Sequence, residues 1–199
     1  MMRITYHLIK PAVRMDNKLL IKLVVVTEAL FFLSLLLVFV YFSLASDFRQ
    51  QQLAALDVRA TGGFSLLLFA SSFTYWRAEA SYRQATPRRL RLWLLLTIGL
   101  GILFLLGQAR EYHSLFGRHI DIASNTFGTS FFTLTGFHAL HVLIGLLVIG
   151  ILTGLSFAGD YDQPKTTIFS TVGIYWHFVD IVWAVVFLLV YVLPHITHL

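Results

Sequence analysis

Five long apolar stretches, separated by short charged blocks, constrain this chain more than any other feature. A helix needs roughly 20 mostly apolar residues to cross about 30 Å of hydrocarbon. No stretch alternates apolar and polar residues with a period of two, so a transmembrane barrel is not expected. We therefore predict an all-α fold, an integral membrane bundle of five transmembrane helices that forms a single membrane domain over residues 1–199. The predicted spans are 20–45, 62–76, 92–107, 127–157 and 168–193.

The composition agrees with a lipid environment. The chain is 57% hydrophobic and 13% charged, and its mean hydropathy is +0.76, whereas soluble domains carry about 25% charged residues. The absence of cysteine excludes disulfides, thiolate zinc sites, iron–sulfur clusters and covalent c-type haem attachment. The net charge of +5 lies in blocks between the apolar runs, so no nucleic-acid partner is expected. The first apolar run is longer than a signal-peptide core, and we expect no cleaved targeting peptide.

The distribution of Lys and Arg predicts the orientation of the bundle. Cytoplasmic loops are enriched in both residues, so the more basic side is cytoplasmic. We therefore expect the amino terminus in the cytoplasm and the carboxyl terminus outside. Tyr41, Trp76, Trp93 and Tyr191 fall near span ends and are expected at the membrane interface. One side holds eleven of the 15 basic residues: Arg3, Lys10, Arg14, Lys18, Lys22, Arg77, Arg83, Arg88, Arg89, Arg91 and Lys165. The other side holds Arg49, Arg59, Arg110 and Arg118.

Glu28 is an ionisable group inside the first predicted span. It lies six residues after Lys22, about 9 Å deeper along a helix. Such groups are costly in hydrocarbon and need a partner or a function. Two interpretations remain open from the residues alone. Glu28 is either a proton-accepting, lipid-facing or cleft-facing carboxyl, or a carboxyl kept uncharged by desolvation and hydrogen-bonded to a neighbouring helix.

Two pairs of polar residues lie in the last two spans. His177 and Asp180 are three residues apart and share one helix face, which suits a structural pair or the outer shell of a metal site. His138 and His141 form an H-x-x-H pair on one face of a helix. Ligands on opposite sides of a haem cannot both come from such a pair. With eight histidines in the chain, a membrane di-iron site is not expected either. We predict structural roles in packing and hydrogen bonding for both pairs.

Two further features lie towards the ends of spans. Glu111 is interfacial and, beside Arg110, is expected to form a solvated pair. Gly150 and Gly154 form a G-x-x-x-G step that would permit a close helix contact. The sequence contains no phosphate-binding loop, nucleophile elbow or H-E-x-x-H motif. The residues alone give a helical bundle with buried polar pairs and no complete catalytic constellation.

Five segments, one for each span, stand out along the chain: TEALFF, FSLLLFASSFT, GILFLLGQAREY, FFTLTGFHALHVLIG and YWHFVDIVW. Together they resemble subunit III of the haem-copper respiratory oxidases, and they occur in that family's order. Thr27 stands where the family usually has serine, Phe64 where it usually has asparagine, and Ala70 where it often has serine. The chain lacks the two additional amino-terminal helices of the seven-helix form and looks like the five-helix bacterial form.

The resemblance implies a non-catalytic, metal-free core subunit of a proton-pumping terminal oxidase, which reduces oxygen to water. Haem and copper would lie on partner subunits, with subunit I as the main partner and subunit II nearby. The chain would bind phospholipid and support proton uptake and turnover stability in a bacterial cytoplasmic (inner) membrane. Glu28 would be the family's buried carboxyl and a possible proton or lipid site. His138, His141, His177 and Asp180 would support helix packing and the subunit I interface.

Two alternatives remain open at this stage. One is a subunit-III-like accessory protein of nitric oxide reductase. The other is an independent membrane haem protein or carrier that uses the intramembrane histidines.

Overall fold

The computed structural model describes residues 17–161, 164 and 166–196, and within them every regular element is a helix. The basic residues Arg3, Lys10, Arg14 and Lys165, on which part of the predicted orientation rests, lie outside the described residues. The elements are α1 (Asn17–Ser43), α2 (Ser46–Ala55), α3 (Val58–Arg83), α4 (Pro87–Gly117), α5 (Thr126–Ala158), α6 (Ile168–Phe187), the π-helical turn η1 (Leu188–Val192) and α7 (Leu193–Ile196).

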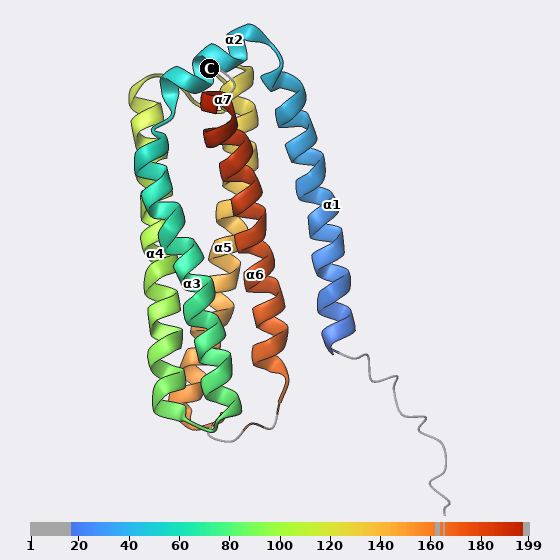
Figure 1. Ribbon diagram of the computed structural model, residues 1–199, viewed down its shortest axis with the longest axis vertical. Helices are drawn as coiled ribbons and strands as arrows, with labels where there is room; N and C mark the ends of the chain where they lie inside the picture. The colour runs from blue at the N-terminus through green and yellow to red at the C-terminus, as the bar shows by residue number, and fades with distance from the viewer. Residues whose placement is uncertain (1–16, 162–163, 165, 197–199) are drawn as a thin grey trace, which may run out of the picture.

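The long helices run side by side, and α6 contacts α1, α3 and α5 (Figure 1). Helices α3 and α4 form an antiparallel hairpin, and α5 packs on α4 and α6. Helix α1 lies on the outer side of the bundle against α5 and α6. Helix α2 crosses one end of the bundle, where α7 also lies, while α1 begins at the other end, with the α3–α4 turn (Figure 1).

Four helical segments are long and apolar enough to cross a membrane: 19–43, 87–117, 126–158 and 168–196. A fifth is counted only if α2 and α3, which are bent by 72° at their junction, form one span together. The reason is that α3 carries many buried hydroxyl residues, which lower its hydropathy. The outer face of α1 exposes aliphatic side chains such as Leu30 at 63% and Leu37 at 61%. Aliphatic surface of this extent is typical of contact with lipid or with another protein.

Local signals in the sequence set the helix boundaries. Asp57 caps α3, since its Oδ1 accepts hydrogen bonds from the backbone N–H groups of Arg59 and Ala60 at 3.0 and 3.1 Å. Asn125 caps α5 in the same way through Gly128 at 2.7 Å. Pro87 occupies the first position of α4, where its missing N–H costs nothing. These caps lie in polar sequence, which explains why α3 and α4 extend well beyond the apolar segments 62–76 and 92–107.

The core is built where α6 meets α3 and α5. Trp176 and Trp183 of α6 are both fully buried. Their indole N–H groups donate to hydroxyls of α3, Trp176 to Ser71 at 3.2 Å and Trp183 to Ser65 at 2.9 Å. On the α5 side, a Cβ added to Gly145 would lie 2.8 Å from the Trp176 ring. Glycine at this position therefore allows α5 and α6 to approach closely.

Two features of the fold differ from the sequence expectations. Helix α2 was not expected, because it is short and polar. It is held by Gln52, which is 2% exposed and donates to the carbonyl of Val190 in the π-helical turn at 2.6 Å. The G-x-x-x-G step does not mediate a close contact within the described residues. Nothing lies within 4 Å of a Cβ added to Gly150 or Gly154, and both face outwards.

Candidate functional site

Helices α1 and α5 bring Glu28 and His141 together, although 113 residues separate them in the chain. Glu28 Oε2 lies 3.0 Å from His141 Nε2. The other ring nitrogen, Nδ1, lies 2.7 Å from the carbonyl oxygen of Phe137 and must therefore carry a hydrogen. A proton must also lie between Nε2 and Oε2, supplied either by the imidazolium or by the carboxyl. The pair thus holds one shared proton at the edge of the bundle.

This pair lines a largely apolar groove of about 350 Å³ between α1, α5 and α6. The Glu28 side chain remains 31% exposed, against 12% for His141. The hydroxyl of Tyr175, on α6, donates to the backbone carbonyl of His141 at 3.2 Å and fixes the floor of the groove. Aliphatic walls around one titratable pair suit an acyl chain whose polar end approaches the pair. The remaining lining residues are Ile21, Val24, Ile144, Val148, Thr171 and Val172.

A second hollow, of about 600 Å³, continues the groove towards the start of α1 and shares Ile21 and Thr171 with it. Its other lining residues are Leu20, Tyr161, Thr166, Thr167 and Ile168. The groove and this hollow together run along the first half of α1, from Leu20 to Glu28.

His138 lies one turn before His141 on α5 but faces the interior. Its ring is 0% exposed and stacks on Trp183 with ring centroids 4.8 Å apart. Phe104 and Phe32 contact it edge-on at 6.0 and 6.4 Å. Neither ring nitrogen has a hydrogen-bond partner among the described residues. His138 therefore packs against aromatic rings without a hydrogen bond among the described residues, and its role in stabilising the bundle stays a prediction.

His177 and Asp180 do not contact each other directly, because Ser72 of α3 lies between them. The Ser72 hydroxyl is 2.9 Å from His177 Nδ1 and donates to Asp180 Oδ2. A single hydroxyl can accept from the imidazole while it donates to the carboxylate, so the three groups form a continuous chain. Asp180 Oδ1 is buried without a partner among the described residues. Sequence reasoning missed Ser72, although it lies in the SSFT part of a segment that carries the family resemblance.

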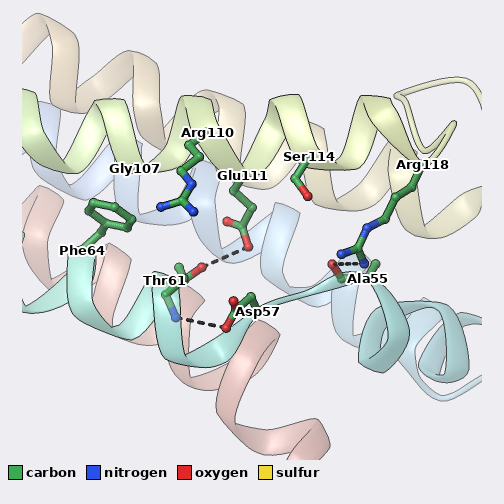
Figure 2. A pocket seen from close by; sticks show the side chains of 10 residues that line it. Ala55, Asp57, Thr61, Phe64, Gly107, Arg110, Glu111, Ser114 and Arg118 are labelled. Carbon is green, nitrogen blue, oxygen red and sulfur yellow. Dashed lines mark hydrogen bonds between the residues drawn. The ribbon is translucent and has the colours of Figure 1, made fainter.

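Glu111 faces the bundle and does not form the expected solvated pair with Arg110. Its Oε1 accepts from the Thr61 hydroxyl at 3.0 Å and its Oε2 from the Tyr191 hydroxyl at 2.7 Å (Figure 2 shows the Thr61 contact). Gln108 donates weakly to the same Oε2 at 3.5 Å. Tyr191 is 0% exposed, so its side chain faces the interior of the bundle. The physical reason is that a buried phenol needs an acceptor, and Glu111 provides one.

Glu79 is a further acidic residue at a helix contact that the sequence did not single out. It lies near the end of α3, where Arg83 and the Ser170 hydroxyl both donate to its Oε1, Ser170 at 2.6 Å. The spacing from Glu79 to Arg83 is the i,i+4 signal of a helical ion pair and could have identified it. Glu79 and Ser72, both on α3, thus form hydrogen bonds with polar side chains of α6.

Among the described residues, no three His, Cys, Asp or Glu side chains are grouped so that they could hold a metal ion. His141 uses both ring nitrogens in the contacts given above. Glu28 binds His141 across α1 and α5, and His177 and Asp180 bind Ser72 across α6 and α3, whereas His138 has no hydrogen-bond partner among the described residues.

Comparison with known proteins identifies the family of this chain. The family model described as cytochrome c oxidase subunit III matches residues 5–194. The chain belongs to this family. It is 35% identical over 173 residues to cytochrome c oxidase subunit 3 of Synechocystis sp., a match that covers 86% of this chain and 73% of that protein.

Other members of the subunit III family are similar to this chain over a shorter segment. Cytochrome c oxidase subunit 3 of Thermostichus vulcanus is 37% identical over 130 residues, covering 65% of this chain and 63% of that protein. The probable cytochrome c oxidase subunit 3 of Mycobacterium tuberculosis is 38% identical over 130 residues, covering 64% and 63%. These matches thus span under two thirds of the length of the latter two relatives. Family membership and the apolar helices make this chain a membrane subunit of a respiratory oxidase.

Proposed function

We propose that this chain is the non-catalytic subunit III of a proton-pumping terminal oxidase in a bacterial inner membrane. In this role it packs on subunit I, near subunit II, binds phospholipid, and supports proton uptake and turnover stability. Haem and copper belong to the partner subunits. The observation that most supports this proposal is the Glu28–His141 pair, which holds a proton beside an open apolar groove.

The proposal includes a single membrane domain of five spans with a cytoplasmic amino terminus and an external carboxyl terminus. Helix α3 has 26 residues and is about 39 Å long, enough to cross the hydrocarbon by itself. The start of α1 and the arginine-rich α3–α4 turn lie at the same end of the bundle, and α2 and α7 lie at the other (Figure 1). This arrangement supports the positive-inside orientation.

The groove supports lipid binding and proton uptake together. Aliphatic side chains from α1, α5 and α6 can hold an acyl chain, while Glu28 and His141 exchange their shared proton with the lipid–water boundary. The contacts of α6 and α5 with other helices contain His177, Asp180 and His138. In this proposal these residues stabilise the helix packing, and the packed bundle presents the surface that binds subunit I.

The experiment is Glu28→Gln in the assembled oxidase. The amide keeps the size of the side chain and a hydrogen bond to His141 but removes the titratable proton. We expect slower proton uptake and a shorter active lifetime during turnover, measured with a pH indicator and an oxygen electrode. Thr27→Val is the matched control, because the Thr27 hydroxyl bonds only the carbonyl of Val24 in its own helix. Unchanged uptake and lifetime in Glu28→Gln would contradict the role given to the pair.

Purification in mild detergent tests the assignment to an oxygen reductase. The chain should co-purify with subunits that carry haem and copper. Co-purification with a nitric oxide reductase instead would replace the proposed complex while leaving the family membership intact.

A further inference from the structure

A small hollow of about 130 Å³ lies where the ends of α2, α3 and α4 meet, on the side of α4 that faces α3 (Figure 2). Charged side chains of both signs line it: Arg110 and Glu111 from α4, Arg118 directly after the end of α4, and Asp57 at the start of α3. Ala55, Ala60, Thr61, Phe64, Gly107 and Ser114 complete the lining. This hollow is separate from the groove beside Glu28, which is built by α1, α5 and α6.

Arg110 provides the available positive charge in this hollow. Its guanidinium makes no hydrogen bond or ion pair with any residue that the structure describes, and Figure 2 shows it extending from α4 towards α3. Arg118, in contrast, donates to the carbonyls of Ala54 and Ala55 at 3.1 and 3.4 Å and thereby holds the end of α2. An unpaired guanidinium that lines a hollow is a ready partner for a phosphate group.

The acidic residues provide the complementary charge. Asp57 uses Oδ1 to cap α3, while its Oδ2 has no hydrogen-bond partner among the described residues. Both oxygens of Glu111 already accept hydrogen bonds, and its carboxyl group lines the hollow together with Asp57. Two acids beside two arginines disfavour a simple anion and favour a ligand with a phosphate and an amine.

The surface below Arg110 is apolar. Leu106 and Leu103 precede Arg110 by four and seven residues, so they lie on the same face of α4, and they are 60% and 47% exposed. Arg110 itself lies seven residues before the end of α4, about 10 Å along the helix axis. Phe64 closes the hollow on this side, since a Cβ added to Gly107 would lie 2.2 Å from its ring. A charged head at Arg110 would therefore place a hydrocarbon chain along these leucines.

We propose that this hollow binds the head group of a zwitterionic, amine-bearing phospholipid. Arg110 binds the phosphate, the open oxygen of Asp57 accepts the ammonium group, and an acyl chain runs over Leu106 and Leu103. The site is a second lipid site of the chain, and its selectivity comes from the pairing of Arg110 with Asp57.

The test uses the full chain with the subunits that accompany it, purified in detergent, stripped of lipid and titrated with phosphatidylethanolamine, phosphatidylglycerol or inorganic phosphate. Native mass spectrometry counts the lipids bound per complex. Arg110→Gln should retain one phosphatidylethanolamine fewer, with affinity at that site lowered about tenfold or more, as expected for a lost charge-assisted hydrogen bond. Asp57→Asn keeps a capping side chain and should weaken phosphatidylethanolamine binding without weakening phosphatidylglycerol.

Arg59→Gln is the matched control, because Arg59 lies at the same end of the bundle but does not line the hollow. It should bind phosphatidylethanolamine as the unaltered chain does. Equal lipid counts in Arg110→Gln and the unaltered chain would overturn the proposal. So would phosphatidylglycerol binding as tightly as phosphatidylethanolamine to the unaltered chain, or an Arg110-dependent site that takes inorganic phosphate and retains no lipid.

Discussion

Replacing Ser72 by alanine removes a single oxygen atom, but it breaks two hydrogen bonds between helices. The Ser72 hydroxyl links α3 to His177 and Asp180 of α6, and the other carboxyl oxygen of Asp180 is already buried without a partner among the described residues. Alanine therefore leaves Asp180 with no hydrogen-bond donor. Interhelical hydrogen bonds in membranes average about 0.6 kcal/mol each, and leaving a buried polar group unsatisfied costs about 1–3 kcal/mol. The second effect dominates, so we expect the free energy of unfolding to fall by about 2 kcal/mol.

Unfolding of the full chain by sodium dodecyl sulfate in mixed micelles measures this loss. Trp176 and Trp183 are fully buried beside α3, so their fluorescence reports separation of α3 from α6. Ser34→Ala is the matched control, since the Ser34 hydroxyl is exposed and bonds only the carbonyl of Phe31 in its own helix.

A double-mutant cycle isolates the physical cause. In an Asp180→Leu background no carboxyl remains to be left unsatisfied, so Ser72→Ala should cost under about 1 kcal/mol there. An equal cost in both backgrounds, or a cost below about 0.5 kcal/mol in the unaltered chain, would refute the reasoning.

Two further substitutions test the packing. Tyr191→Phe removes the donor to Glu111 and should lower the free energy of unfolding by about 1 kcal/mol, whereas Tyr41→Phe, at a side chain that is 71% exposed, should change nothing in the same titration. Gly145→Ala places a methyl group 2.8 Å from the Trp176 ring and should destabilise by about 1–3 kcal/mol. Gly150→Ala meets nothing within 4 Å and should be neutral or stabilising; equal effects at both glycines would show that α5 and α6 do not pack as described.

The sequence predicted the α5 helix almost to the residue, 127–157 against Thr126–Ala158, because a long apolar run is a local signal. It underestimated α3, 62–76 against Val58–Arg83, because the helix continues at both ends into charged residues such as Arg59, Arg77 and Glu79. The polar helix α2 had no apolar signal at all. It depends on a contact of Gln52 with a carbonyl 138 residues away.

For the candidate site too, part could be predicted from the sequence and part could not. Glu28, His141, His177 and Asp180 could be identified from the sequence, because ionisable residues inside apolar runs need partners. Which partners they have could not, since Glu28 meets His141 across 113 residues and Ser72 meets Asp180 across 108. The sequence by itself determined that this chain is a bundle of apolar helices of the subunit III family, because apolarity and segment order are local properties. Only the tertiary structure decided that Glu111 binds Thr61 and Tyr191 and not Arg110, and that Arg110 lines a hollow. Hydrogen-bond partners depend on which helix faces approach each other, and that is set by packing over the whole bundle.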